Sequence, residues 1–131
     1  MKETSPLRGH PVLIVESKVF ASYLVAECIV RRKMKGLVVL NDVPVKEGLL
    51  EFMNRKNLDA AIIHTAVPDD EELILKARDA GKKILIIKKD PITQEEINFY
   101  KSIEKKGVAT IEKTAGKDIE EYVDKLETLF N

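Results

Sequence analysis

LDAAIIHTAVPDD, residues 58–70, is the stretch that decides the fold. Its residues 60–63 are all apolar, and a polar run that reaches Pro68 follows them. A short, continuous apolar run of this kind is typical of a strand that is buried on both faces of a parallel sheet. In open α/β sheets, ligands bind beyond the carboxyl ends of the strands. The residue at that end is His64, so its chemistry bears directly on function.

The composition indicates one globular domain with no strong overall charge. The chain has 131 residues, enough to bury a core without staples, and it is 44% hydrophobic and 34% charged. Lys plus Arg and Asp plus Glu both total 22, so the net charge is zero. No global field therefore attracts nucleic acid or an anionic membrane.

The single cysteine and the lengths of the apolar runs indicate the cellular location to expect. Cys28 is the only cysteine, so neither an internal disulfide nor a multi-cysteine metal site is possible within one chain. The first residues lack an apolar signal-peptide core, and no run approaches the roughly 18 apolar residues that cross a membrane. We expect a cytoplasmic protein with a flexible lead-in at residues 1–10 and one domain at residues 11–131.

Further apolar runs resemble the one in the opening stretch and predict strands. The five predicted strands are residues 12–15, 37–40, 60–63, 84–87 and 108–111. Amphipathic helices are predicted near residues 18–35, 44–53, 69–80, 90–106 and 118–129. Capping signals place Pro44 in the first turn of the second helix, four acids at 69–72 in that of the third, and Asp90 at the N-cap of the fourth.

Strands that alternate with helices along one chain predict a parallel sheet with helices on both faces. Right-handed crossover connections then leave the doubly wound strand orders as candidates. The fold class predicted from the pattern alone is therefore α/β, as one domain without an internal repeat.

Four segments carry a resemblance to a known family: VLIVES (12–17), LDAAIIHTAVP (58–68), KILIIKK (83–89) and GVATIEKT (107–114). By their order, their spacing and the proline after the third strand, residues 11 to 130 resemble the receiver domain of two-component response regulators. The resemblance implies a flavodoxin-like, doubly wound (βα)5 three-layer sandwich. Its five-stranded parallel sheet would have the order 2-1-3-4-5.

In that family an acidic pair closes the first strand and holds magnesium, and an Asp after the third strand takes a phosphoryl group. A Thr or Ser follows the fourth strand and a Lys the fifth. The matching residues here are, in order, Glu16, Ser17, His64, Lys88 and Lys113. Only Lys113 keeps the family's residue, and Thr110 stands where the family has its switch aromatic.

These replacements predict a degenerate site. The family site gathers three carboxylates and one ammonium group, which suits a hard divalent cation with oxygen ligands. Here the same positions offer one carboxylate, two ammonium groups and an imidazole. We therefore expect no catalytic residue, no metal and no cofactor. The predicted function is a pseudo-receiver in a two-component-type pathway, which is not an enzyme and docks to a signalling protein or to a second copy without phosphorylation.

Several interpretations of the site residues stay open. An ion pair from Glu16 to Lys88 or Lys113 would fill the vacated metal position. Alternatively, the two lysines and the helix N-terminus after Ser17 bind a small anion. His64 is expected to be a hydrogen-bonded side chain at the strand end, although phosphorylation or metal ligation of its ring are alternatives.

Two surface features have competing interpretations as well. Ile97 and Tyr100 flank the fourth helix, and they are either the edge of the core or an exposed apolar interface. In receivers that helix belongs to the usual partner or dimer face. The basic segment at residues 31–35 is expected to be a solvated helix end, and nucleic-acid binding is not expected.

Two other functions remain alternatives. The first is a phosphorylatable single-domain response regulator. The second is a magnesium-dependent nucleic-acid enzyme, because VLIVES also resembles the strand-Glu motif of the Toprim domain of topoisomerases and primases. The later acids of that motif would have to come from residues 69–72, which follow Pro68.

Overall fold

The computed structural model describes residues 9–16, 23, 27, 37–90, 93–113 and 119–130. These ranges contain a five-stranded sheet made of β1 (Val12–Val15), β2 (Leu37–Leu40), β3 (Ala60–Ile63), β4 (Lys83–Lys88) and β5 (Ala109–Glu112). They also contain the helices α2 (Leu49–Arg55), α3 (Glu71–Asp79), α4 (Gln94–Lys105) and α5 (Ile119–Thr128), with a short 3-10 turn, η2 (Pro68–Asp70), before α3. The predicted first helix, Cys28 and the basic segment 31–35 lie outside the described residues.

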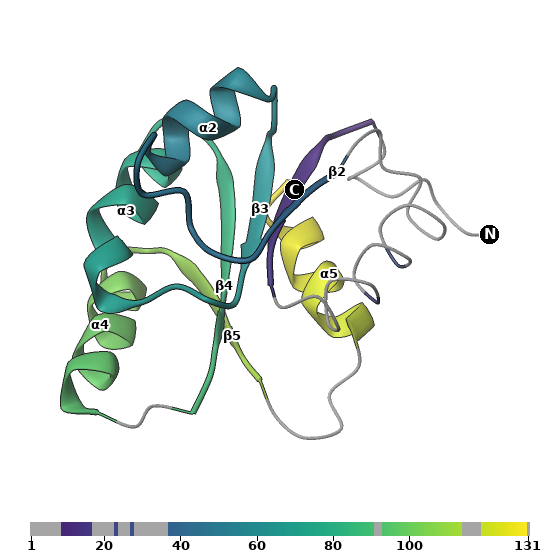
Figure 1. Ribbon diagram of the computed structural model, residues 1–131. Helices are drawn as coiled ribbons and strands as arrows, with labels where there is room; N and C mark the ends of the chain where they lie inside the picture. Colours follow the sequence, from purple (N-terminus) through teal and green to yellow (C-terminus); the bar gives the residue numbers. More distant parts are fainter. Residues whose placement is uncertain are drawn as a thin grey trace.

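The strands are all parallel and run in the order β2-β1-β3-β4-β5 (Figure 1). This confirms the doubly wound, flavodoxin-like sheet. β1, β2 and β3 have the predicted bounds, whereas β4 extends one residue further at each end and β5 begins and ends one residue later. β1 lies between β2 and β3, with Val12 opposite both Leu37 and Ala60.

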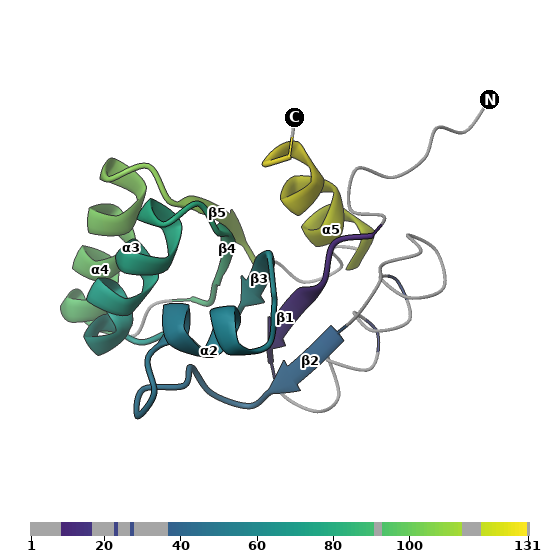
Figure 2. The same ribbon diagram turned by 90° about the horizontal axis from the view of Figure 1, so that it is seen from above.

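The sheet is the middle layer of the molecule. Helices α2, α3 and α4 cover one face, and α5 lies on the other (Figure 2). Alternate residues of each strand enter two separate cores: Leu13 and Val15 face the α2–α4 side, and Val12 and Ile14 face the α5 side. Every residue of β1 and β3 is buried. The continuous apolar runs therefore have the predicted cause, which is burial on both faces.

The second helix begins later than predicted. Gly48, not a residue near Pro44, is the N-cap of α2, and its φ of 95° suits a residue without a side chain. The Gly48 N–H donates to the Pro44 carbonyl at 2.9 Å, which closes a single turn before the helix. The prediction that Pro44 lies in the first helical turn was wrong, because a separate turn comes between the proline and Leu49.

Asp90 is likewise not the N-cap of the fourth helix. Thr93 caps α4: its hydroxyl accepts the Glu96 N–H at 3.1 Å, and Glu96 Oε1 accepts the Thr93 N–H at 3.1 Å. This reciprocal capping box satisfies two backbone donors at once, whereas a lone aspartate would satisfy one. The helix consequently starts at Gln94, after a longer loop from β4.

The acids after β3 divide into two roles. Asp70 belongs to the 3-10 turn, is 3% exposed, and accepts the Val67 N–H through Oδ2 at 2.9 Å. Burial is the main cause that raises the pKa of its carboxyl group. Glu71 and Glu72 occupy the first turn of α3, where the helix dipole favours negative charge.

The edge at which the strands begin is joined to the end of the chain. His10 Nδ1 lies 2.9 Å from Asp59 Oδ2, and the His10 ring contacts the Phe130 ring with centroids 4.7 Å apart. The fold thus already includes His10, the last residue of the predicted lead-in.

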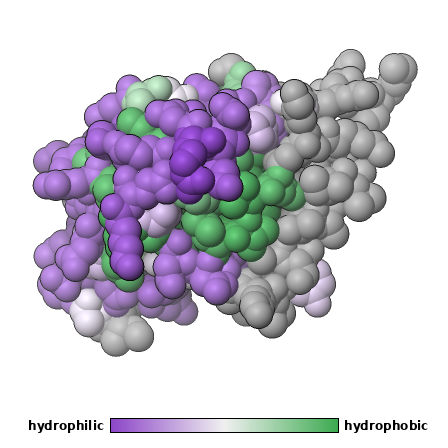
Figure 3. All heavy atoms as spheres, turned by 45° about the horizontal axis from the view of Figure 1, so that its top comes forward, coloured by the Kyte–Doolittle hydropathy of each residue, from purple (hydrophilic) through white to green (hydrophobic). Residues whose placement is uncertain are grey.

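The surface in Figure 3 is mainly hydrophilic, with an apolar area next to the grey atoms. It lies on the side where Figure 1 draws β2, the edge strand, whose Val39 is 42% exposed. No helix within the described ranges is both long and apolar enough to span a bilayer.

Candidate functional site

The predicted site residues gather where the strands end. Glu16 directly follows β1, His64 follows β3, Lys88 is the last residue of β4, and Lys113 follows β5. Backbone hydrogen bonds continue the sheet by one residue here. The Glu16 N–H donates to Leu40 O, the His64 N–H to Val15 O and the Lys113 N–H to Lys88 O, each at 2.9 Å. The hydrogen-bond ladder of the sheet therefore extends to the backbone of Glu16, His64 and Lys113.

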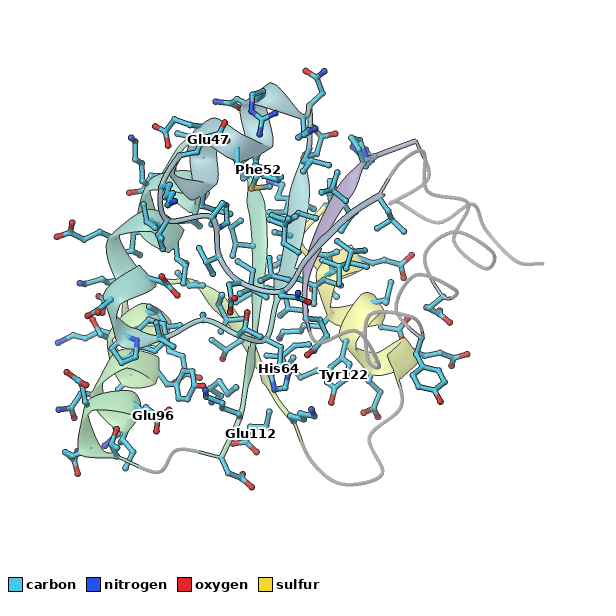
Figure 4. The ribbon with its side chains drawn as sticks, viewed as in Figure 1. Glu47, Phe52, His64, Glu96, Glu112 and Tyr122 are labelled. Carbon is cyan, nitrogen blue, oxygen red and sulfur yellow. The ribbon has the colours of Figure 1, made fainter. Side chains whose placement is uncertain are left out.

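A buried pair of Glu16 and His64 occupies the centre of the site. His64 Nδ1 lies 2.8 Å from Glu16 Oε1, and the side chains are 13% and 3% exposed. Figure 4 shows His64 at the edge of the sheet where β3 ends. An ionised carboxylate can only accept, so Nδ1 carries the proton and donates it. The other ring nitrogen, Nε2, is also buried. Burial, and then the negative charge of Glu16, raise the pKa of the Tyr122 phenol on α5.

Lys88 does not pair with Glu16 as one interpretation expected; it pairs with Glu104 of α4. Glu104 Oε2 lies 2.7 Å from Lys88 Nζ and also accepts the Thr110 hydroxyl at 2.6 Å. One carboxylate oxygen therefore joins the end of β4, the middle of β5 and α4. We call these three residues the Glu104 brace. Hydrogen bonds from Lys88 and then Thr110 hold the pKa of Glu104 below its ordinary value.

A hollow of about 290 Å³ opens beside this brace, between α4 and the ends of β4 and β5. Its lining combines cations, carboxylates and two apolar side chains: Lys88, Lys89, Lys101, Lys113, Asp90, Glu104, Glu112, Ile97 and Tyr100. Tyr100 is only 6% exposed and its ring contacts that of Phe99, with centroids 5.3 Å apart. Tyr100 is thus the edge of the core, and the exposed apolar flank reduces to the half-buried Ile97.

One solved structure has this architecture over nearly the whole chain. It is the crystal structure of HP1043, an orphan response regulator of H. pylori, with a TM-score of 0.67 and 19% sequence identity over 95% of this chain and 99% of that one. The chain has the fold of a response-regulator receiver domain. Comparison with protein-family models and with curated protein sequences gives no match.

Seen as receiver positions, the strand ends hold an altered set of groups. His64, the residue expected at the phosphoacceptor position, is mostly buried against Glu16, and Lys88, the residue expected at the hydroxyl position, is bound to an α4 carboxylate. Ser17 lies outside the described residues. Within those residues, no cluster of three His, Cys, Asp or Glu side chains is arranged to hold a metal ion. Glu16 is the one carboxylate that the receiver pattern leaves at this site.

Sequence reasoning missed Glu104 altogether. Glu104 lies four residues after Tyr100 and seven after Ile97, so helical periodicity already placed it on the α4 face that turns toward β5. This spacing was an available signal. What it did not contain was the distance across to Lys88 and Thr110, which belong to two different strands.

Glu104→Gln is expected to lower the free energy of unfolding by about 1 kcal/mol near neutral pH, since Glu104 is 38% exposed and water screens the pair. The pKa of Glu104 is lowered on folding, so the stability it contributes is present above its ordinary pKa of 4.5 and is lost as pH falls through the lower folded value. The free energies of unfolding of the unmodified protein and of Glu104→Gln, measured with urea, should therefore converge at acid pH. Asp42→Asn, at an exposed position in the loop after β2, is the control, and an equal loss for both variants would contradict the brace.

Proposed function

We propose that this chain is a receiver-like signalling domain that acts by docking to another protein or to a second copy, without a phosphorylation switch. The observation that carries the proposal is the buried Glu16–His64 pair. In this pair the carboxylate expected to serve a metal ion is bound to an imidazole. The likeness to an orphan response regulator agrees with a signalling role.

The charges at the strand ends oppose phosphoryl transfer. Magnesium selects oxygen ligands, whereas Glu16 Oε1 lies 2.8 Å from a ring nitrogen of the His64 imidazole. Nor does His64 suit the role of phosphoacceptor itself, because Nδ1 is bound to Glu16 and Nε2 is buried. Acyl-phosphate chemistry would thus lack both its nucleophile and its electrostatic stabiliser.

The Glu104 brace supports a docking surface with one fixed arrangement. Lys88 and Thr110 are bound to the same oxygen of an α4 side chain, so β4, β5 and α4 are held together without any added group. The face beside the brace combines the half-buried Ile97 with both signs of charge. Such a face favours a protein partner with a complementary charge pattern, or a second copy in a symmetric arrangement.

The other interpretations have less support. A small anion at Lys88 and Lys113 would compete with Glu104 for Lys88, in a hollow that also contains Asp90 and Glu112. For a Toprim-like enzyme, acids from residues 69–72 would have to bind magnesium. Of these, Asp70 is buried and accepts the Val67 N–H, and Glu71 accepts from Ser102 and Lys106.

Treatment with acetyl phosphate and magnesium tests the proposal. We expect no covalent adduct by intact-mass measurement and no magnesium-dependent change in the amide spectrum of α4 and β5. In parallel, a photoreactive residue at position 97 should capture the same partner or second copy with and without the phosphodonor. The same group at Val45, which is 63% exposed and outside the α4–β5 hollow, should not capture it.

A phosphorylated product would instead establish the phosphorylatable regulator. Capture at position 97 that appears only after the phosphodonor is added would equally contradict a switch-independent domain. Equal capture at positions 97 and 45 would mean that the α4–β5 face is not the docking surface.

A further inference from the structure

A second hollow lies at the opposite edge of the sheet, where the strands begin. It encloses about 180 Å³ between the α3–β4 turn, the α4–β5 turn and the end of α5. Arg78, Lys82 and Lys83 line it together with two glycines and apolar residues, and no carboxylate of the described chain is part of the lining. This lining differs from that of the hollow beside α4, where carboxylates accompany the lysines.

Two of the three cations are held in place without being fully neutralised. Arg78 Nη1 donates to Lys106 O at 2.7 Å, and Lys82 Nζ donates to Leu58 O at 2.8 Å. A carbonyl satisfies one donor but does not cancel the positive charge. Among the described residues, only Asp79 pairs a carboxylate with these two cations: it accepts from Arg78 Nε at 2.8 Å and is 66% exposed. Backbone carbonyls thus orient the Arg78 guanidinium and the Lys82 ammonium group, and each group keeps N–H donors that are not used in these hydrogen bonds.

Lys83 is the third cation, at the first residue of β4, and its side chain is partly buried. Its ammonium group makes no hydrogen bond or ion pair with any residue that the structure describes. Ala109 and Leu129 lie in the same lining, so the hollow that Lys83 lines is partly apolar. A charge in such surroundings is stabilised by a counter-ion.

The backbone around the hollow leaves room for such a counter-ion. Gly81, with φ of +96°, ends the turn before β4, and a Cβ built on it would meet no atom within 4 Å. Gly107, with φ of +90°, forms the opposite wall. An oxyanion can therefore approach the main chain closely at this turn.

We infer that this hollow binds a small multivalent oxyanion, of the phosphate or pyrophosphate class. Three cationic residues line one cavity, and the donors that Arg78 and the two lysines keep match the several oxygens of a phosphate better than a single carboxylate. The site lies at the far edge of the sheet from Glu16 and His64. It does not depend on the proposed docking function, and it is distinct from the anion considered at Lys88 and Lys113.

Titration of the full chain with inorganic pyrophosphate, followed by amide NMR and calorimetry at low salt, tests the inference. Saturable shifts are expected at Gly81 and Gly107. Lys83→Gln should weaken binding about tenfold, because it removes one charge-assisted contact. Lys105→Gln, exposed at the end of α4 on the same edge and outside the lining, should change the affinity by less than about twofold. Citrate, as a multivalent carboxylate, should bind more weakly than pyrophosphate.

Three results would overturn the inference. The first is shifts that centre on Lys88 and Lys113, which would place the anion at the other edge. The second is equal weakening by Lys83→Gln and Lys105→Gln, which would indicate diffuse electrostatic attraction only. The third is the absence of saturable shifts. If Lys83→Gln does not fold, Lys82→Gln replaces it, with the same expected loss and the same control.

Discussion

His64→Leu is expected to lower the free energy of unfolding by about 3 kcal/mol, because it leaves the buried Glu16 carboxylate without its imidazole donor. Glu16 is 3% exposed, so water cannot replace the lost hydrogen bond. Urea unfolding at neutral pH, monitored by circular dichroism, measures the change.

The matched control is His10→Leu. His10 and Asp59 form a pair of nearly the same length, 2.9 Å against 2.8 Å, but their side chains are 41% and 48% exposed. Leucine keeps an apolar contact with Phe130, so the expected loss is at most about 1 kcal/mol. Similar losses in the two variants would show that burial does not set the strength of the Glu16–His64 pair, and would remove the main support for the proposed function.

Tyr100→Ala should cost about 3 kcal/mol of stability, because the ring is 6% exposed and packs beside Phe99. Tyr100→Phe removes only the hydroxyl, whose oxygen accepts the Lys89 N–H at 3.3 Å, and should cost less than about 1 kcal/mol. Thermal and urea unfolding of the three proteins distinguish packing from hydrogen bonding.

Ile97→Ala provides the comparison on the same face of α4. Its side chain lines the hollow and is only half-buried, so we expect a loss of at most about 1 kcal/mol. Docking should then be weakened by Ile97→Ala, while Tyr100→Ala acts mainly through folding. A Tyr100→Ala protein with unchanged stability and lost docking would contradict the assignment of Tyr100 to the core.

The sheet was predictable because its signal is local. Val12–Val15 and Ala60–Ile63 are continuous apolar runs, and burial on both faces is the common reason for such runs in a parallel sheet. Helix starts were less predictable. Asp90 and Pro44 are good local signals, but the capping box of Thr93 and Glu96 and the separate turn that ends at Gly48 competed with them and prevailed.

The sequence predicted which residues meet at the candidate site, but not which of their side chains bind one another. The ends of parallel strands meet at one edge, so Glu16, His64, Lys88 and Lys113 had to come near one another. Which carboxylate binds which donor depends on how far a side chain reaches across neighbouring elements. Glu104 reaches Lys88 and Thr110 from a helix, and His64 donates to Glu16.

The amino-acid sequence by itself determined the α/β architecture, the strand order implied by the receiver resemblance, and the loss of carboxylates at the strand ends. These three features follow from hydrophobic runs and residue identities, which are properties of the linear sequence. Only the tertiary structure decided that His64 is buried against Glu16, that Glu104 joins α4 to two strands, and that three cationic residues line a hollow at the other edge. The reason is physical: hydrogen bonds and charge pairs form between residues far apart in sequence, and their partners are selected by distances that exist only after the elements pack.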